Sequence, residues 1–431
     1  MNEYDSNRIL AIAEKINYKK TENLNEADCY IINTCHIREK ATAKVYHDIG
    51  RVKKNFRNKT KPIVLVTGCV AQAEGEILME KEKYIDAVIG PQSYHHLNTI
   101  IKKIENYSEK INSTNFEVIE KFDTLNNLKN SDGKVSSYLT IQEGCDKFCK
   151  FCVVPYTRGA EFSRSIKELF DECQYLVNKG SREITLLGQN VNAYNYNGQK
   201  LPELIKKIST IKNLKRIRYT TSHPIDFTDD LIKMHSETDK LMPLIHLPVQ
   251  SGSNKILKEM NRGHTIEDYL KIIDKLKSVN PLIKFSSDFI IGYPGETKND
   301  FMQTIQLLKE VNFINCYSFI YSERPGTPAA KIKKISDNIT KERLKIFQNE
   351  SNKIKINYRK NLFNKKSKVL FENRIGNKDK FFGRDEYSNS IIVTSKKNVK
   401  GKIENVEIIN GNQNTLYGEI NIKIEDKEFA A

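Results

Sequence analysis

The sequence of 431 residues contains no run of about eighteen apolar residues, which a membrane-spanning helix would need. Its first residues, Met1 to Asp5, are polar and acidic, so we expect no secretory signal there. Acidic residues are fewer than basic ones: the chain has 54 Asp and Glu and 70 Lys and Arg, which gives a formal net charge of +16. These absences argue against a membrane or secreted protein and predict a cytoplasmic one.

The excess of positive charge favours a polyanionic partner, with nucleic acid as the first candidate. Many Lys, Asn and Ile residues also fit an AT-rich genome, so the charge alone is weak support. The length predicts two to four domains with an ample core. In a cytoplasmic protein the eight cysteines are expected to be metal ligands rather than disulfides.

Three cysteines, Cys145, Cys149 and Cys152, follow one another at the spacing C-x3-C-x2-C. They come just after the alternating run 137–141, which predicts a loop that leaves a strand. Three thiolates are one fewer than a tetrahedral zinc site or a fully ligated cubane cluster needs, so a [4Fe-4S] cluster held here keeps one iron open for an outside ligand. Zinc would need a fourth Cys or His, which residues 153–172 do not offer. Three unrelated buried thiols are the remaining alternative.

This stretch resembles the radical S-adenosylmethionine (SAM) enzymes, whose signature is C-x3-C-x2-C. With its flanks, residues 142–145 and 151–159, it is similar to the methylthiotransferases, and most similar to the family of tRNA-2-methylthio-N6-dimethylallyladenosine synthases. The resemblance covers essentially the whole chain. It implies an enzyme that uses two [4Fe-4S] clusters and S-adenosylmethionine. It also implies that Cys145, Cys149 and Cys152 hold the radical SAM cluster.

Residues 1–105 alternate helices with short buried strands, which predicts a parallel α/β sheet. Two of these strands are followed by Cys35 and Cys69, at the carboxyl ends of the strands, where parallel sheets usually bind ligands. Either cysteine alone would be read as a core thiol. The resemblance implies instead that both hold the auxiliary [4Fe-4S] cluster of a methylthiotransferase N-terminal domain.

The family's third auxiliary cysteine comes directly before the position that corresponds to Met1. We therefore expect Met1 to be an internal residue, with a first strand and one cluster ligand upstream. Cys29 is a poor substitute, because it lies near the opposite end of the strand that leads to Cys35. If the chain does start at Met1, a weak auxiliary cluster and an exposed gap in the sheet are expected.

Residues 106–136 read as a linker, and residues 137–363 as a radical SAM domain with a basic helical connector from 331. Six strand–helix units predict a partial (βα)6 barrel, with its chemistry at the carboxyl ends of the strands. The six predicted strands are 138–141, 183–187, 216–220, 244–247, 284–291 and 316–320. The resemblance implies that Gln189 holds the amino group of SAM, and that Gln250 and Asp288 contact its ribose and methionyl parts. No catalytic side chain is assigned.

Residues 364–431 carry short strands with Gly and Asn turns, which predicts a small β-barrel that resembles the RNA-binding TRAM domain. Its basic residues are candidates for phosphate contacts, and its aromatic residues for stacking or packing, with at least one of the Phe pair in the core. These residues are Lys378, Lys380, Phe381, Phe382, Arg384, Tyr387, Lys396, Lys397 and Lys400.

The resemblance implies methylthiolation of C2 of N6-(dimethylallyl)adenosine next to the anticodon in tRNA, with SAM as radical source and methyl donor. It further implies an electron donor such as flavodoxin or ferredoxin and a monomeric protein. Other substrates remain open, namely threonylcarbamoyl-adenosine in tRNA or a ribosomal protein aspartate, although the latter family typically has His-Ala-Ser where this chain has residues 250–253. An inactive iron–sulfur RNA-binding protein and a zinc-binding module are the alternatives from other classes.

Overall fold

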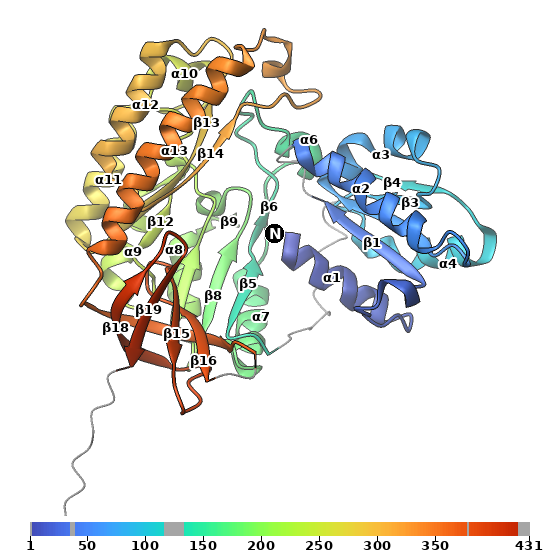
Figure 1. The fold of residues 1–431 in the computed structure, drawn as a ribbon, viewed down its shortest axis with the longest axis horizontal. Helices are drawn as coiled ribbons and strands as arrows, with labels where there is room; N and C mark the ends of the chain where they lie inside the picture. The colour runs from blue at the N-terminus through green and yellow to red at the C-terminus, as the bar shows by residue number, and fades with distance from the viewer. Residues whose placement is uncertain (1, 35–38, 116–132, 377–378, 421–431) are drawn as a thin grey trace, which may run out of the picture.

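The computed structural model describes residues 2–34, 39–115, 133–376 and 379–420. It contains an N-terminal α/β domain, a partial barrel of six parallel strands and a closed C-terminal barrel of five strands (Figure 1). Within these residues no helix has both the length and the apolar content to cross a membrane. The mixed α/β architecture predicted from the sequence is confirmed.

The N-terminal sheet has four parallel strands in the order β1-β2-β3-β4, and helices pack on both of its faces. The strands are β1 (Cys29–Thr34), β2 (Ile63–Gly68), β3 (Ala87–Ile89) and β4 (Ile111–Ser113). Helices α1 (Asn2–Glu14) and α4 (Leu97–Tyr107) cover one face, and α2 (Glu39–Asn55) and α3 (Cys69–Lys81) cover the other.

Strand β1 pairs directly with β2 in the described sheet. One expectation for this part of the chain is corrected. Strand β4 lies inside the predicted linker 106–136, because it pairs with β3 and extends the sheet beyond residue 105.

The partial barrel consists of two three-stranded parallel sheets, β11-β8-β5 and β12-β13-β14, which are joined by a bridge between Ile217 and Leu241. The strands are β5 (Ser136–Thr140), β8 (Glu183–Leu187), β11 (Arg216–Tyr219), β12 (Leu244–His246), β13 (Lys284–Ile291) and β14 (Asn315–Ile320). Each lies within two residues of its predicted range. In the described part of the chain β5 and β14 do not pair with each other, so the barrel is open between these two edge strands.

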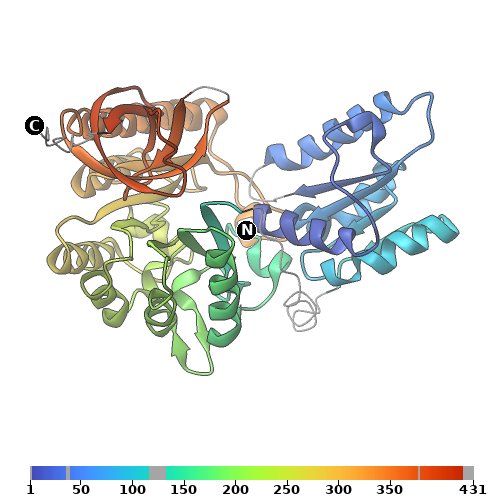
Figure 2. The same cartoon turned by 90° about the horizontal axis from the view of Figure 1, so that it is seen from below.

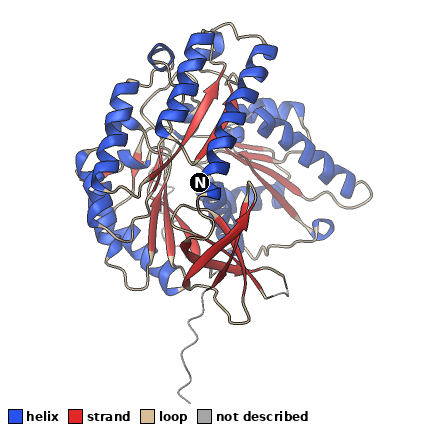
Figure 3. Ribbon diagram, turned by 60° about the vertical axis from the view of Figure 1, so that its left-hand side comes forward, coloured by secondary structure: helices blue, strands red, loops and turns tan. Residues whose placement is uncertain are grey.

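Helices cover the outside of this barrel (Figure 3). They are α7 (Ile166–Asn178), α8 (Leu201–Ser209), α9 (Asp229–Glu237), α10 (Asn254–Glu259), α11 (Ile266–Val279), α12 (Lys298–Val311) and α13 (Asp337–Lys360). Several begin at a Ser or Thr whose side chain accepts from the first turn, as Ser165 does from the Glu168 N–H. Short elements complete the domain: α6 (Val154–Arg158), the pair β6 (Gln142–Glu143) and β7 (Phe162–Ser163), and the pair β9 (Asn195–Tyr196) and β10 (Gln199–Lys200).

The C-terminal barrel closes in the order β15-β16-β17-β19-β18 around a small apolar core. Its strands are β15 (Lys366–Arg374), β16 (Lys380–Arg384), β17 (Ser390–Thr394), β18 (Ile403–Gly411) and β19 (Thr415–Ile420). It docks on the end of the partial barrel where β8 and β11 begin (Figures 1 and 2). There Arg216 donates to the carbonyls of Lys368 and Arg384 at 2.8 Å, and Arg218 donates in the same way to residues 385 and 386.

Candidate functional site

The three-cysteine loop leaves β6 at the carboxyl end of the partial barrel and leads into α6. It folds back on the chain that follows, since the Cys145 N–H donates to the Gly159 carbonyl at 3.2 Å. Gly144 allows this close approach: its φ is 79°, and a Cβ there would lie 1.9 Å from the Ala160 carbonyl oxygen. A side chain at this position would push the loop open.

The sulfur atoms of this loop are set among hydrogen-bond donors. Burial raises the pKa of the Cys145 thiol to about 12 and that of Cys152 to about 11, while backbone N–H groups of Lys147 and Val154 act in the opposite direction. Arg262 donates from Nη1 to the Cys149 sulfur at 3.5 Å. Thiols of this kind lose their protons when they bind a metal.

The donor set fits a cluster better than a single ion. Among the described residues no three His, Cys, Asp or Glu side chains gather around one point, as a single metal ion would require. A cubane cluster binds each thiolate on a different iron, so its ligands need not converge on one atom. Three cysteines on one partly buried loop, with N–H donors near their sulfurs, fit that requirement.

Cys69 is the first residue of α3, whereas the sequence predicted a loop position. The preceding Gly68 has a φ of 93°, and a Cβ there would lie 2.1 Å from the Thr34 carbonyl oxygen, so the helix begins at once. The register pairs Thr34 with Gly68, the residues directly before the two predicted auxiliary ligands. Cys35 itself lies outside the described residues.

Arg158 joins the two domains at the site. It is buried, and its Nη2 donates to Asp5 of α1 at 2.6 Å, while its Nη1 faces Glu143 at 3.4 Å. Its Nε donates to the Cys69 sulfur. Burial is the main cause that raises the pKa of Cys152, and electrostatic interactions with Cys149 and then Cys69 raise it further.

Gln189, a predicted SAM contact, forms a hydrogen bond with the backbone directly before the first cysteine of the loop. Its Oε1 accepts the Gly144 N–H at 2.6 Å. Gln142 in turn accepts the N–H groups of Gln189 and Asn190 at 3.0 and 3.1 Å. The loop after β8 is therefore bonded to the loop after β5, and the contact of Gln189 with SAM stays a prediction.

Gln250 and Asp288, the other predicted SAM contacts, lie side by side. The Gln250 N–H donates to the Asp288 carbonyl at 3.0 Å, and Gln250 has a φ of 78°, which is unusual for a residue with a side chain. The Asp288 carboxylate faces His246 Nε2 at 3.4 Å, and His246 Nδ1 lies 2.9 Å from the Ser286 hydroxyl. The structure thus brings a His and a carboxylate together inside the barrel.

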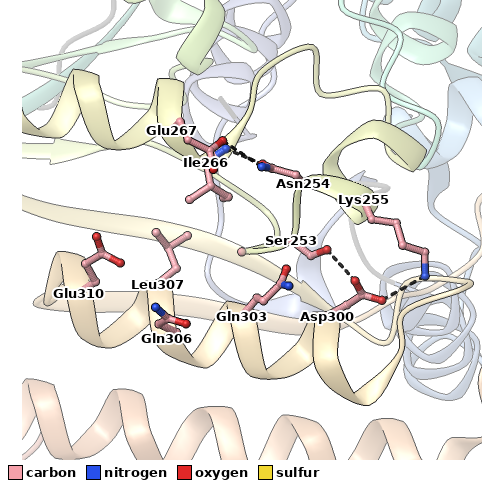
Figure 4. A pocket seen from close by; sticks show the side chains of 11 residues that line it. Ser253, Asn254, Lys255, Ile266, Glu267, Asp300, Gln303, Gln306, Leu307 and Glu310 are labelled. Atoms are coloured by element: carbon pink, nitrogen blue, oxygen red, sulfur yellow. Dashed lines mark hydrogen bonds and ion pairs between the residues drawn. The ribbon is translucent and has the colours of Figure 1, made fainter.

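The residues that follow Gln250 have a different role. A Cβ on Gly252 would lie 2.5 Å from the Thr304 Cα, so glycine lets this segment pack against α12. Ser253 donates to Asp300 at 2.7 Å, and Lys255 reaches the same carboxylate (Figure 4). The groove of about 340 Å³ at this place is lined by the first residues of α10 and α11 and by one side of α12, and the cysteine loop contributes no residue to it.

Sequence reasoning missed Arg262 and Asp226. Asp226 accepts from Lys147 of the cysteine loop at 2.8 Å and from Asn190 at 2.7 Å. Asp226 ends a short 3-10 helix and Arg262 follows α10, and only the tertiary fold brings both residues to the loop. His223, one of the polar residues at a strand end, is buried beside His264, and burial lowers its pKa, so it belongs to the supporting structure.

Comparisons with known proteins show the family of the chain. Residues 139–308 match the Radical SAM superfamily, and residues 1–90 match the Uncharacterized protein family UPF0004. The tRNA-2-methylthio-N(6)-dimethylallyladenosine synthase of Pelagibacter ubique (strain HTCC1062) is 55% identical, over 97% of this chain and 95% of that protein. The chain belongs to this synthase family. The synthase of Rickettsia akari (strain Hartford) is 46% identical over 97% of both chains.

A solved structure supports the fold of this synthase family member. The radical S-adenosylmethionine methyltransferase TsrM from Kitasatospora setae superposes with a TM-score of 0.57 at 12% identity, over 77% of this chain and 74% of that one. At this identity the likeness concerns the fold alone. Together with family membership, it confirms the predictions of a radical SAM fold and of an enzyme.

Proposed function

We propose that this chain methylthiolates C2 of N6-(dimethylallyl)adenosine next to the anticodon in tRNA, with S-adenosylmethionine as radical source and methyl donor. The observation that carries the proposal is identity of 46–55% over nearly the full length of synthases named for that product. Those names favour the dimethylallyl nucleoside over threonylcarbamoyl-adenosine and over a ribosomal aspartate. The three-cysteine loop at the carboxyl end of a partial barrel supports the same chemistry.

In this proposal Cys145, Cys149 and Cys152 hold the radical cluster, and Cys35 and Cys69 hold the auxiliary cluster. When bound, the two [4Fe-4S] clusters and S-adenosylmethionine supply the one-electron and sulfur chemistry that side chains cannot provide.

The chain itself orients and shields these groups. Arg262 directs a guanidinium N–H to the Cys149 sulfur, which favours a negatively charged sulfur ligand there. Gln189 fixes the backbone at Gly144, directly before the first cysteine. Gln250 and Asp288 stay the proposed contacts of S-adenosylmethionine; Asp288 lies within β13, and Gln250 follows β12 and forms an isolated bridge with Phe289 of β13.

The C-terminal barrel is the proposed RNA-binding domain. Of its candidate residues, Phe381 is buried in the core, and Phe382 carries the Arg384 guanidinium 5.1 Å from its ring centroid. Lys378 lies outside the described residues. A base in an anticodon loop is already partly unstacked, which lowers the cost of moving it into a site. We place the reaction in the cytoplasm, with a monomeric enzyme and an electron donor such as flavodoxin or ferredoxin.

The test uses the full chain, reconstituted anaerobically with iron and sulfide, and tRNA that carries N6-(dimethylallyl)adenosine. We expect mass spectrometry to find the 2-methylthio nucleoside together with 5′-deoxyadenosine. A product only on tRNA that carries threonylcarbamoyl-adenosine would change the substrate. A brown protein that never cleaves S-adenosylmethionine would support the inactive RNA-binding alternative, and a colourless zinc-loaded protein would support the zinc module.

A further inference from the structure

The three-cysteine loop and the helix after it carry an exposed aromatic pair. Phe148, which directly precedes Cys149, is 54% exposed, and Tyr156 of α6 is 46% exposed. The two rings meet edge to face, with a centroid distance of 6.4 Å and an interplanar angle of 77°. Large aromatic side chains are mostly buried in folded proteins, so a pair of them held in solvent indicates a contact surface.

The backbone keeps Phe148 in this exposed position at a conformational cost. Its φ is 46°, in the left-handed region that a residue with a bulky side chain rarely adopts. The Phe148 carbonyl accepts from Asn261 Nδ2 at 3.1 Å, and the Lys150 N–H donates to the Met260 carbonyl at 3.0 Å. Strained backbone that neighbouring hydrogen bonds keep in place is typical of functional positions. The loop is therefore fixed with the Phe148 ring exposed.

The surface around this aromatic pair is positively charged. The Ala329 N–H donates to the Lys150 carbonyl at 3.0 Å, which places the segment 328–334 beside the loop. Lys331 and Lys333 of this segment are exposed, and they make no ion pair with any residue that the structure describes. Six Lys and only two acidic residues lie on the three segments next to the pair, namely 146–150, 258–261 and 331–334.

An aromatic centre with a basic rim suits transient docking of an acidic electron-carrier protein. Redox complexes bury little area, and a few aromatic contacts can supply most of their binding energy. Electron transfer slows steeply with distance, and Phe148 is bonded directly to Cys149, a proposed ligand of the radical cluster. A carrier at Phe148 would therefore reach that cluster through two adjacent residues. A flavin ring exposed on a carrier offers an aromatic edge for these side chains, which a ferredoxin cluster lacks.

We propose that Phe148 and Tyr156, with the lysines around them, form the docking surface for a flavodoxin-type carrier with an acidic surface. The inference rests on the proposed function and deepens it, because it says where the reductant of that reaction binds. The step passes one electron to the radical cluster from the anionic flavin hydroquinone, which becomes the neutral semiquinone, and no bond is made or broken. Complementary charge steers the two proteins together, and the aromatic pair fixes the contact.

The first measurement is the affinity of the full chain for fluorescently labelled, oxidised flavodoxin. Fluorescence anisotropy gives this affinity without any turnover of the enzyme. We expect Phe148→Ser and Tyr156→Ser each to weaken binding at least about fivefold. Lys331→Gln combined with Lys333→Gln should weaken binding too, and should make the affinity depend less on salt.

Two control variants match these changes in exposure and in charge. Tyr107→Ser removes an aromatic ring that is 76% exposed at the end of α4, in the N-terminal domain. Lys206→Gln combined with Lys212→Gln removes two charges from other exposed positions of the partial barrel. Both controls should bind flavodoxin as the wild-type protein does.

The second measurement separates docking from damage to the cluster. Cleavage of S-adenosylmethionine driven by reduced flavodoxin should slow at least about fivefold in both aromatic variants. Cleavage driven by dithionite should match the wild-type protein, because this small reductant needs no docking surface, and the iron content should match as well. Tyr156 lies outside the cysteine loop, so Tyr156→Ser tests the inference if Phe148→Ser loses iron.

Unchanged flavodoxin affinity and unchanged flavodoxin-driven cleavage in Tyr156→Ser and in the lysine variant would overturn the inference alone, provided that dithionite activates the wild-type protein. Variants that lose affinity for tRNA and keep affinity for flavodoxin would overturn it too, because the surface would then bind RNA. A wild-type protein that ferredoxin reduces and flavodoxin does not would overturn the choice of a flavin carrier. A wild-type protein that cannot cleave S-adenosylmethionine even with dithionite would overturn the proposed function, and the inference with it.

Discussion

Arg158 donates a hydrogen bond from Nε to the Cys69 sulfur, over 3.4 Å and 89 positions of sequence. Arg158 ends the short helix that follows the three-cysteine loop, and Cys69 opens a helix of the N-terminal domain. The same guanidinium group faces the buried carboxylates of Asp5 and Glu143. One side chain therefore links the helix after the three-cysteine loop to Cys69, a proposed ligand of the auxiliary cluster, and to α1 of the N-terminal domain.

The first prediction concerns this connection. Arg158→Met removes the cation that faces two buried carboxylates, so we expect the free energy of unfolding to fall by about 3–5 kcal/mol. Urea denaturation measures the loss. Lys167→Met, which breaks an exposed pair with Asp171, is the control and should have little effect. Equal stability of the two variants would show that the buried cation contributes nothing.

The second prediction separates the two sets of thiols. Ala at Cys145, Cys149 or Cys152 should abolish formation of 5′-deoxyadenosine, because each thiolate is a proposed ligand of the radical cluster. Cys69→Ala should keep that activity and lose the methylthio product. Cys173→Ala is the control: this cysteine is buried in the hydrophobic core on α7, and its loss should leave both products in place. Retained cleavage in a Cys145 variant would remove that residue from the cluster.

The strands and the cysteine loop were predictable because local patterns specify them. The apolar runs of the six barrel strands end within two residues of the observed strands, and close cysteine spacing needs no tertiary information. Strand β18 was missed, because a register shift between Ile408 and Asn410 breaks its alternation and the apolar residues Ile403 and Ile409 are exposed. Arg262 and Asp226 could not be predicted for another reason, since their roles depend on contacts that only the folded chain creates.

The third prediction compares two glycines of the N-terminal domain. Gly68→Ala forces a side chain into a left-handed conformation and against the Thr34 carbonyl, so it should destabilise the protein by at least about 1–2 kcal/mol and lower the iron content. Gly50→Ala lies on an exposed face of α2 with nothing within 4 Å of the new Cβ. It should stabilise the protein by about 0.5–1 kcal/mol. Thermal unfolding measures both changes, and a shift in the same direction would contradict the argument.

The fourth prediction concerns pH. Burial lowers the pKa of His235 to about 3, and its Nε2 lies 2.7 Å from the Tyr219 hydroxyl. The unfolded chain binds a proton at His235 near pH 6.5, but the folded protein does not. The contribution of the buried neutral His235 to the free energy of unfolding is therefore fully present above about pH 6.5 and is lost as the pH falls towards 3. His235→Gln should reduce the acid slope by about one proton in denaturation curves between pH 4 and 6. Tyr219→Phe, which keeps the histidine buried, should leave the slope unchanged.

The last prediction concerns tRNA binding by the C-terminal barrel. Deletion of residues 364–431 should weaken tRNA binding, but it also removes the carbonyls that Arg216 and Arg218 bind, and so it mixes two effects. Lys396, Lys397 and Lys400 are exposed, and changing them to Gln leaves the docking contacts intact.

We expect the triple variant to bind tRNA more weakly and to flatten the dependence of log Kd on log salt, by about 0.7–0.9 for each phosphate contact that is lost. The triple variant Lys206→Gln, Lys212→Gln and Lys233→Gln, at exposed positions of the partial barrel, removes the same three charges and is the control for net charge. If both sets flatten the slope equally, tRNA binding reflects the overall charge of +16 and not a surface of the C-terminal barrel.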